Sequence, residues 1–273
     1  SPYGVVVDNN TDSNNFGRIL VTEAQSSLPA TGYHSSKEEN GIGTGIYAFD
    51  QMLQPIKNSE GKYGFLSGMT PAEGKYEGTT TTIYDFKRLA MSEDGRLFVS
   101  RTNPTTAGVY ELNPNDLEAA ATAVFEGTIG ADGNITNADG KFVAGPATGL
   151  SVSGAGDELM LAVVSCDNGY ALSTSAHHVD VYNLGKNKTW SAVPSNRVTT
   201  LDDYWINSAT VNACLDPDGM GLMVGQYRGA PSEAEPAYKH VDLVTNMVDY
   251  ADITTPAGGA GMAWNANHTL FAM

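Results

Sequence analysis

The sequence predicts an all-β fold assembled from one repeated unit. Short apolar strands recur in pairs, and turns rich in Gly, Asp and Asn join the strands of each pair. Such turns let the backbone adopt positive φ angles and reverse direction. No segment shows the apolar period of an amphipathic helix, so we expect almost no helix. At 273 residues, the chain has the length of one large domain or two small ones.

The repeated unit opens with a hairpin of two apolar strands. Its clearest copy places residues 88–91 and 96–99 on either side of a turn that ends in Asp94-Gly95. These two strands are apolar almost throughout, which indicates burial on both faces. Further copies of the hairpin cover residues 4–21, 149–163, 211–224 and 261–272.

A third strand, in which apolar and polar residues alternate, follows each of the first four hairpins. Residues 108–112 show this period of two, which is typical of a half-buried strand. The other copies lie at residues 45–50, 179–184 and 238–243. We expect a fourth strand in each unit, at residues 63–65, 123–125, 188–190 and 247–250.

Antiparallel units of three or four strands that repeat in this way are typical of the blades of a β-propeller. We therefore predict a single β-propeller domain over residues 1–273, with four complete blades and part of a fifth. Because the fifth unit stops after its first hairpin, we expect a fragment of a larger propeller, with the first and last strands side by side. The predicted blades lie approximately at residues 1–66, 84–127, 148–190 and 208–251, and the partial blade at 259–273.

Two segments carry a resemblance to known repeats. Residues 92–99 and 108–112 resemble blades of NHL-type and related secreted propellers. The opening residues 1–9 and 16–19 look like repeats in secreted propellers of Bacteroidetes-type bacteria. The resemblance covers essentially the whole chain, but only at the level of the repeat. It implies the fold and an extracellular or cell-surface location, and it transfers no catalytic residues because such propellers have many functions.

The charge balance restricts the partners. The chain has 15 Lys and Arg against 31 Asp and Glu, which gives a net charge of −16. This field repels phosphate backbones and anionic membrane surfaces. No apolar window is long enough to span a bilayer. We expect a glycan or protein ligand, no nucleic acid and no membrane insertion.

Candidate ligand-binding residues lie on the long loops. The loops between second and third strands, and those between blades, are long and polar, and a propeller gathers them on one face. Aromatic rings there suit the apolar face of a sugar, while Arg, Asp and Asn suit its hydroxyls; the same groups suit a peptide. For the aromatic residues, packing at a blade edge is the alternative. The candidates are Arg101, Asn103, Asp167, Asn168, Tyr204, Trp205, Tyr227 and Arg228.

A metal site has weaker support. Asp8, Asn10 and Asp12 place oxygen atoms at alternate positions, as a calcium loop does. The Gly and the closing Glu of an EF-hand are missing, and Asn-rich turns are common without calcium. We expect no cofactor, with calcium at this turn as a weak alternative.

Enzyme signatures are missing from the sequence: it has no GxSxG elbow, P-loop or kinase motif. The first hypothesis is therefore a non-catalytic secreted or cell-surface module that binds a glycan or a protein. The second is a propeller glycosidase, lyase or lactonase, which would bring ionisable groups from several blades together at the channel mouth. The third is a structural repeat domain of a larger adhesin.

The strand order also makes a prediction for the two cysteines. Cys166 follows a second strand, at the long-loop end, whereas Cys214 lies in the next first strand, close to the short turn. Several residues of strand, at about 3.3 Å each, separate the two positions. A disulfide needs Cα atoms within about 7 Å, so we expect no bond between them.

Overall fold

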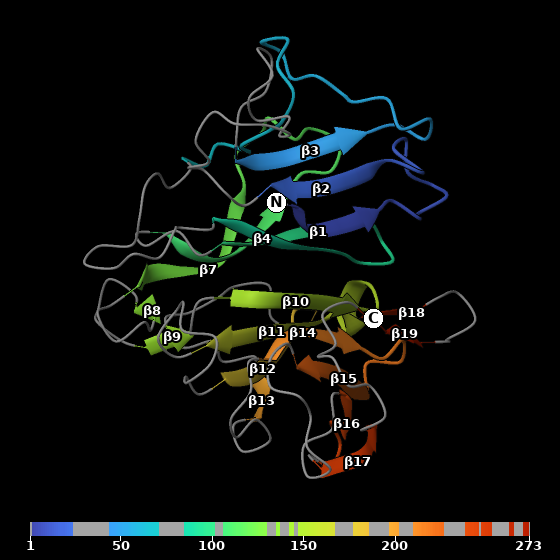
Figure 1. The fold of residues 1–273 in the computed structure, drawn as a ribbon, viewed down its shortest axis with the longest axis vertical. Helices are drawn as coiled ribbons and strands as arrows, with labels where there is room; N and C mark the ends of the chain where they lie inside the picture. The colour runs from blue at the N-terminus through green and yellow to red at the C-terminus, as the bar shows by residue number, and fades with distance from the viewer. Residues whose placement is uncertain are drawn as a thin grey trace.

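The computed structural model consists of antiparallel sheets (Figure 1). One 3-10 turn, η2 (Gly156–Glu158), is the only helical segment in the described ranges, as predicted. No helix in these ranges is long and apolar enough to cross a membrane. The structure describes residues 2–23, 44–70, 85–101, 106–129, 135–136, 142–144, 147–166, 177–185, 197–201, 210–226, 238–245, 247–252, 262–264 and 270–272.

The strands pair in chain order to form successive sheets. The first sheet contains β1 (Pro2–Val7), β2 (Ile19–Glu23) and β3 (Gly45–Phe49). The second contains β4 (Phe86–Met91), β5 (Leu97–Arg101), β6 (Ala107–Leu112), β7 (Thr122–Ile129), β8 (Ile135–Thr136) and β9 (Phe142–Ala144). The third contains β10 (Ala147–Ser153), β11 (Met160–Cys166), β12 (His177–Asn183) and β13 (Arg197–Leu201). The fourth contains β14 (Thr210–Leu215), β15 (Gly221–Gln226), β16 (Tyr238–Asp242) and β17 (Met247–Asp252), and the fifth pairs β18 (Met262–Trp264) with β19 (Leu270–Ala272).

The first strand of each sheet contacts the first strand of the next. β1 contacts β4, β4 contacts β10, β10 contacts β14, and β14 contacts β18. Successive sheets therefore stack face to face along their first strands, which is the blade arrangement of a β-propeller. The described strands form an arc that does not close into a ring.

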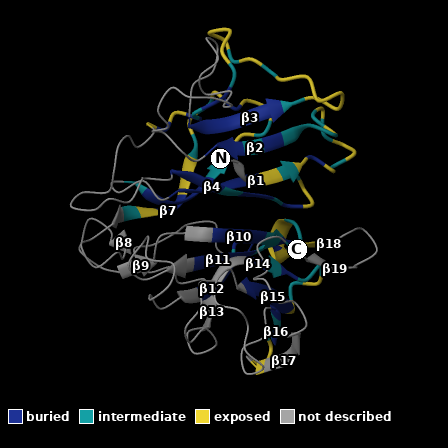
Figure 2. Cartoon of the chain, viewed as in Figure 1, coloured by how far each residue is buried: buried dark blue, intermediate teal, exposed yellow. Residues whose placement is uncertain are grey.

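The apolar core lies between the sheets (Figure 2). One cluster joins the first and second sheets, for example through Leu20 and Leu97. A second cluster joins the second and third sheets, where Phe98 and Leu161 are both fully buried. A third joins the third and fourth sheets, and Val181 belongs to it. Each blade thus buries apolar side chains against the next, as the apolar hairpins predicted.

Irregular register recurs at equivalent places in the blades. Such bulges bend a strand and increase its local twist. The pairing of first and second strands shifts near the start of the first strand, between Pro2 and Gly4, Phe86 and Leu89, Ala147 and Gly149, and Thr210 and Asn212. The pairing of third and fourth strands shifts between Val109 and Tyr110, Val181 and Tyr182, and His240 and Val241. The repeat therefore extends to details of backbone geometry.

At the first interface the backbones of β1 and β4 approach closely. A Cβ atom on Gly4 would lie 2.7 Å from the Leu89 nitrogen and 2.9 Å from the Lys87 oxygen. The Thr22 hydroxyl accepts a hydrogen bond from the Gly4 N–H at 2.8 Å and donates one to the Lys87 carbonyl at 2.5 Å. Only glycine fits at this point of β1.

Hydrogen bonds also join the turns of neighbouring sheets. The Gly156 N–H donates to the Asp94 carboxylate at 3.1 Å, which ties the third sheet to the second. Burial alone would raise the pKa of Asp94, but hydrogen bonds from Ser92 and from backbone N–H groups, with the charge of Arg96, lower it overall. The Ser153 hydroxyl donates to the Asp216 carbonyl at 2.7 Å and ties the third sheet to the fourth.

The structure differs from the predicted strands in two blades. In the first sheet, isolated bridges join Phe65 to Ile46 and Pro55 to Phe49, where we expected a fourth strand. In the third sheet, β13 pairs with β12 as the fourth strand, while residues 188–190, where we expected it, lie outside the described ranges. Short apolar runs are ambiguous signals, and residues 63–65 consist of only two aromatic residues around a glycine. The fourth strands of the second and fourth sheets are confirmed.

The expectation for the cysteines is confirmed, because Cys214 is a thiol and not half of a disulfide. Because the arc of described strands does not close, the expected placement of the first and last strands side by side is not seen among the described residues. On β1, Val6 packs into the core, whereas Val5 and Val7 are exposed. The face of β1 that points away from β4 therefore offers an apolar surface on which a further blade could pack.

Replacing Gly4 with alanine tests the first interface. The added methyl group collides with backbone atoms of β4, so we expect Gly4→Ala to lower the free energy of unfolding by about 1–3 kcal/mol. The control is Val5→Ala, since Val5 is 63% exposed. Equal stability of Gly4→Ala and wild type in urea unfolding would show that β1 does not lie against β4.

Candidate functional site

Arg101 is the one predicted ligand-binding residue that the structure describes, and its guanidinium is buried. Its Nε and Nη2 atoms donate to the two carboxylate oxygens of Asp85 at 2.8 and 2.7 Å. Nη2 also donates to the Thr70 carbonyl at 2.7 Å, and the guanidinium lies 5.0 Å from the centroid of the Phe86 ring. Such bidentate charged pairs are strong and geometrically specific. Arg101 therefore anchors the base of a long loop, and its part in ligand binding stays a prediction.

Further ionisable groups surround this ion pair. The Tyr110 hydroxyl lies 2.7 Å from the Glu126 carboxylate, and burial, followed by this carboxylate, raises the pKa of Tyr110. The pKa of Lys87 is lowered to about 7, mainly by burial and then by the charge of Arg88, while the charge of Asp85 opposes the change. All these residues belong to the second sheet or its flanks. Where the structure is described, this cluster comes from one blade, whereas the enzyme hypothesis expects several.

The other predicted ligand-binding residues lie outside the described ranges, so their role stays a prediction. They are Asn103, Asp167, Asn168, Tyr204, Trp205, Tyr227 and Arg228.

The turn proposed as a weak calcium site is held by its own hydrogen bonds. The buried Asp8 carboxylate accepts the Asn10 N–H at 3.0 Å and the Ser13 hydroxyl at 2.6 Å. The Asn10 side-chain oxygen accepts the Asp12 N–H at 3.0 Å. No group of three or more His, Cys, Asp or Glu in the described ranges is placed to hold a metal ion. Calcium binding at this turn stays a prediction.

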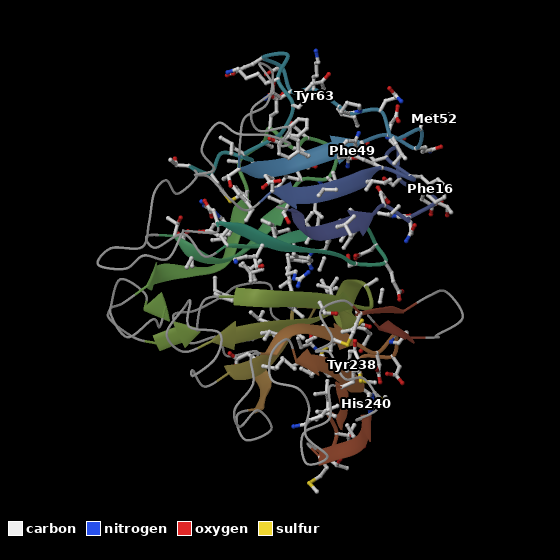
Figure 3. The ribbon with its side chains drawn as sticks, in the orientation of Figure 1. Phe16, Phe49, Met52, Tyr63, Tyr238 and His240 are labelled. Carbon is white, nitrogen blue, oxygen red and sulfur yellow. The ribbon has the colours of Figure 1, made fainter. Side chains whose placement is uncertain are left out.

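A groove lies at the opposite, short-turn end of the first sheet. Two turns form it: the turn between β1 and β2, and the turn that follows β3. Its volume is about 310 Å³, within the range of small-ligand pockets. Phe16 and Met52 project from these turns on the same side of the molecule (Figure 3). The lining residues are Asn14, Asn15, Phe16, Arg18, Asp50, Gln51, Met52 and Ile56.

Local hydrogen bonds fix both turns. The Asp50 carboxylate accepts the N–H groups of Met52 and Gln54, each at 2.8 Å, which closes the turn after β3. The Gln51 side chain donates to the Phe16 carbonyl at 2.6 Å and joins the two turns. Gly17 has a φ of +79°, and a Cβ atom there would lie 2.6 Å from Gln51. Gly17 therefore provides both the backbone conformation and the space for this junction.

Apolar side chains are exposed around the groove. Phe16, Met52 and Leu53 are 45%, 78% and 66% exposed. Leu53 also has a φ of 60°, a left-handed conformation that costs a non-glycine residue roughly 1–2 kcal/mol. The chain thus keeps a leucine that is both exposed and strained at the tip of a turn. We name Phe16, Met52 and Leu53 the tip patch.

A second group of exposed apolar side chains lies at the corresponding turns of the fourth sheet. It consists of Met220, Val244 and Met247. Sequence reasoning missed both groups because it placed function on the long loops. One signal in the sequence could have indicated the first group. Met52 and Leu53 stand in the middle of a tight turn, where Gly, Asn and Asp are the usual residues.

Comparison with known proteins finds similarity among solved structures. No protein-family model and no curated protein matches the sequence. The chain is similar in structure to a chain of the crystal structure of the mitotic checkpoint complex, with 12% identity, a TM-score of 0.43 and coverage of 97% of this chain and 59% of the other. It is similar to the structure of U3-55K, with 11% identity, a TM-score of 0.43 and coverage of 91% and 50%. The assignment to the β-propeller class rests on the strand order and sheet contacts of this chain.

Leu53→Asn tests the strain at the tip. Asparagine tolerates the left-handed conformation, so we expect this variant to raise the free energy of unfolding by about 0.5–1 kcal/mol. Met52→Asn is the matched control, and no gain is expected because Met52 has no positive φ. Thermal unfolding measures both. A stability gain in the control alone, or in neither variant, would argue against a strained Leu53.

Proposed function

We propose that the chain is a non-catalytic protein-binding module, and that the groove with its tip patch is a binding surface. The observation that supports this most is the strained, exposed Leu53 beside the exposed Phe16 and Met52. Exposed apolar side chains gathered at a groove are typical of interaction sites. A residue with a strained backbone and a largely exposed apolar side chain points to a role outside the packing of the fold.

The construction of the groove suits binding. Hydrogen bonds from Met52, Gln54 and Gln51 hold the two turns in place without a ligand. A surface that is already ordered loses less conformational entropy when a partner binds. The groove is also large enough to take one or two side chains of a partner.

The sequence supports two further parts of the proposal: a location and a second class of ligand. The resemblance to secreted repeat propellers supports an extracellular or cell-surface location in a bacterium. The polar and aromatic residues of the long loops, such as Trp205 and Tyr227, support a second surface for a glycan. The single-blade origin of the ionisable cluster around Arg101 and Lys87 favours binding over catalysis.

Selection from a display library of short linear peptides tests the proposal. We expect the selected peptides to bind wild type and to lose about five- to thirtyfold in affinity with Met52→Ser, as for an apolar interface anchor worth 1–2 kcal/mol. Met220→Ser is the matched control, since Met220 is also an exposed methionine in a turn. Calorimetry of synthetic peptides gives the affinities.

Two outcomes would contradict the proposal. If Met220→Ser weakens binding and Met52→Ser does not, the binding surface belongs to the fourth sheet. If no peptide is selected and a glycan array gives a ligand whose binding is unaffected by Met52→Ser, the groove has no part in recognition.

A further inference from the structure

We infer that the groove recognises a carboxylate next to a large apolar side chain, in a protein segment that is otherwise uncharged. This inference rests on the proposed function and names the chemistry of the ligand. The carboxylate can belong to an Asp or Glu side chain or to a chain terminus, and the experiment below separates these sources.

Arg18 lines the groove and is partly buried. Its Nη1 atom donates to the Pro114 carbonyl at 3.0 Å. The guanidinium of Arg18 makes no other hydrogen bond to the described residues. A guanidinium has five N–H donors, so Arg18 keeps donors for a ligand on Nε and Nη2.

Two other arginines provide an internal comparison. Arg96 donates to both carboxylate oxygens of Glu111 at 2.7 and 2.8 Å, and this raises the pKa of Arg96. Arg101 has the same bidentate arrangement with Asp85. Arg18 has no carboxylate within salt-bridge distance among the described residues, and burial lowers the pKa of Arg18 although the charge of Asp8 opposes this. Arg18 is therefore a partly buried cation that has the Asp8 charge nearby but no carboxylate in direct contact among the described residues.

The neighbouring carboxylates are already used. Asp8 accepts from Asn10 and Ser13 through its two oxygens. Asp50 accepts two backbone N–H groups that close its turn. Both of these Asp50 contacts are to Oδ1, and among the described residues neither Asp8 nor Asp50 lies within salt-bridge distance of Arg18. A carboxylate from outside would supply the missing partner, because arginine and carboxylate match in a bidentate geometry.

The walls of the groove define the rest of the ligand. Phe16, Met52 and Ile56 line it together with Arg18, so an apolar side chain beside the carboxylate would contact them. The net charge of −16 repels a polyanion at long range. A single carboxylate in an apolar, otherwise neutral segment satisfies both conditions.

A pair of small probes tests the inference apart from any peptide. 4-Phenylbutyrate joins an aromatic ring to a carboxylate, and 4-phenylbutyramide is its neutral counterpart. By NMR titration we expect the acid to bind wild type about tenfold more tightly than the amide, as a charged hydrogen-bonded pair should. Arg18→Gln should remove this preference and Arg18→Lys should keep part of it. Lys62→Gln, at an exposed cation that follows β3 and does not line the groove, should not change it.

Peptides from the library test the source of the carboxylate. Each is compared with versions in which Glu or Asp becomes Gln or Asn, or in which the terminal carboxylate is amidated. Equal binding of acid and amide to wild type, or a preference that survives in Arg18→Gln, would overturn the inference. Peptides that need Met52 but show no preference for a carboxylate would leave the protein-binding function in place and refute this inference alone.

Discussion

The close approach of the first strands is the constraint on which the rest of the structure depends. Because β4, β10 and β14 each lie between two neighbouring first strands, their side chains are largely buried on both faces and their backbones lie close to other backbones. Gly4 allows this contact at β4, and the Thr22 hydroxyl satisfies the polar groups there. Between the third and fourth sheets, Ser151 and Ser153 perform the same task, since their hydroxyls bond the Leu215 N–H and the Asp216 carbonyl. Small hydroxyl residues thus satisfy backbone groups where neighbouring blades meet.

This constraint also decides where a binding surface can form. With the first strand innermost, the turns between first and second strands and between third and fourth strands lie at one end of every sheet. An Asp or Asn at the end of the third strand holds several of these outer turns, as Asp50, Asn113 and Asp242 do. Hydrogen bonds from the Thr245 and Val244 N–H groups lower the pKa of Asp242 accordingly. The same kind of turn therefore follows the third strand in several sheets. In the first sheet, this turn carries the exposed Met52 and Leu53.

Much of the fold could be predicted from the sequence because burial leaves a pattern in it. The alternation over residues 108–112 and the apolar run over residues 159–164 both became strands. The bulges could not be predicted, since no residue pattern marks them. The ion pair of Arg101 with Asp85 could not be predicted, because the two residues meet only through the pairing of β4 with β5. The groove was missed because exposure of Phe16 and Met52 depends on which turns meet, and this is a property of the whole sheet.

The central claim is that the first strand of each repeat is the innermost. Amide hydrogen exchange followed by NMR tests it directly, because amides in the buried centre of a fold open least often. The account predicts the slowest exchange in β4, β10 and β14 and faster exchange in the fourth strands β7, β13 and β17. Exchange in the fourth strands that is as slow as in the first strands, or slower, would contradict the strand order and with it the placement of the groove.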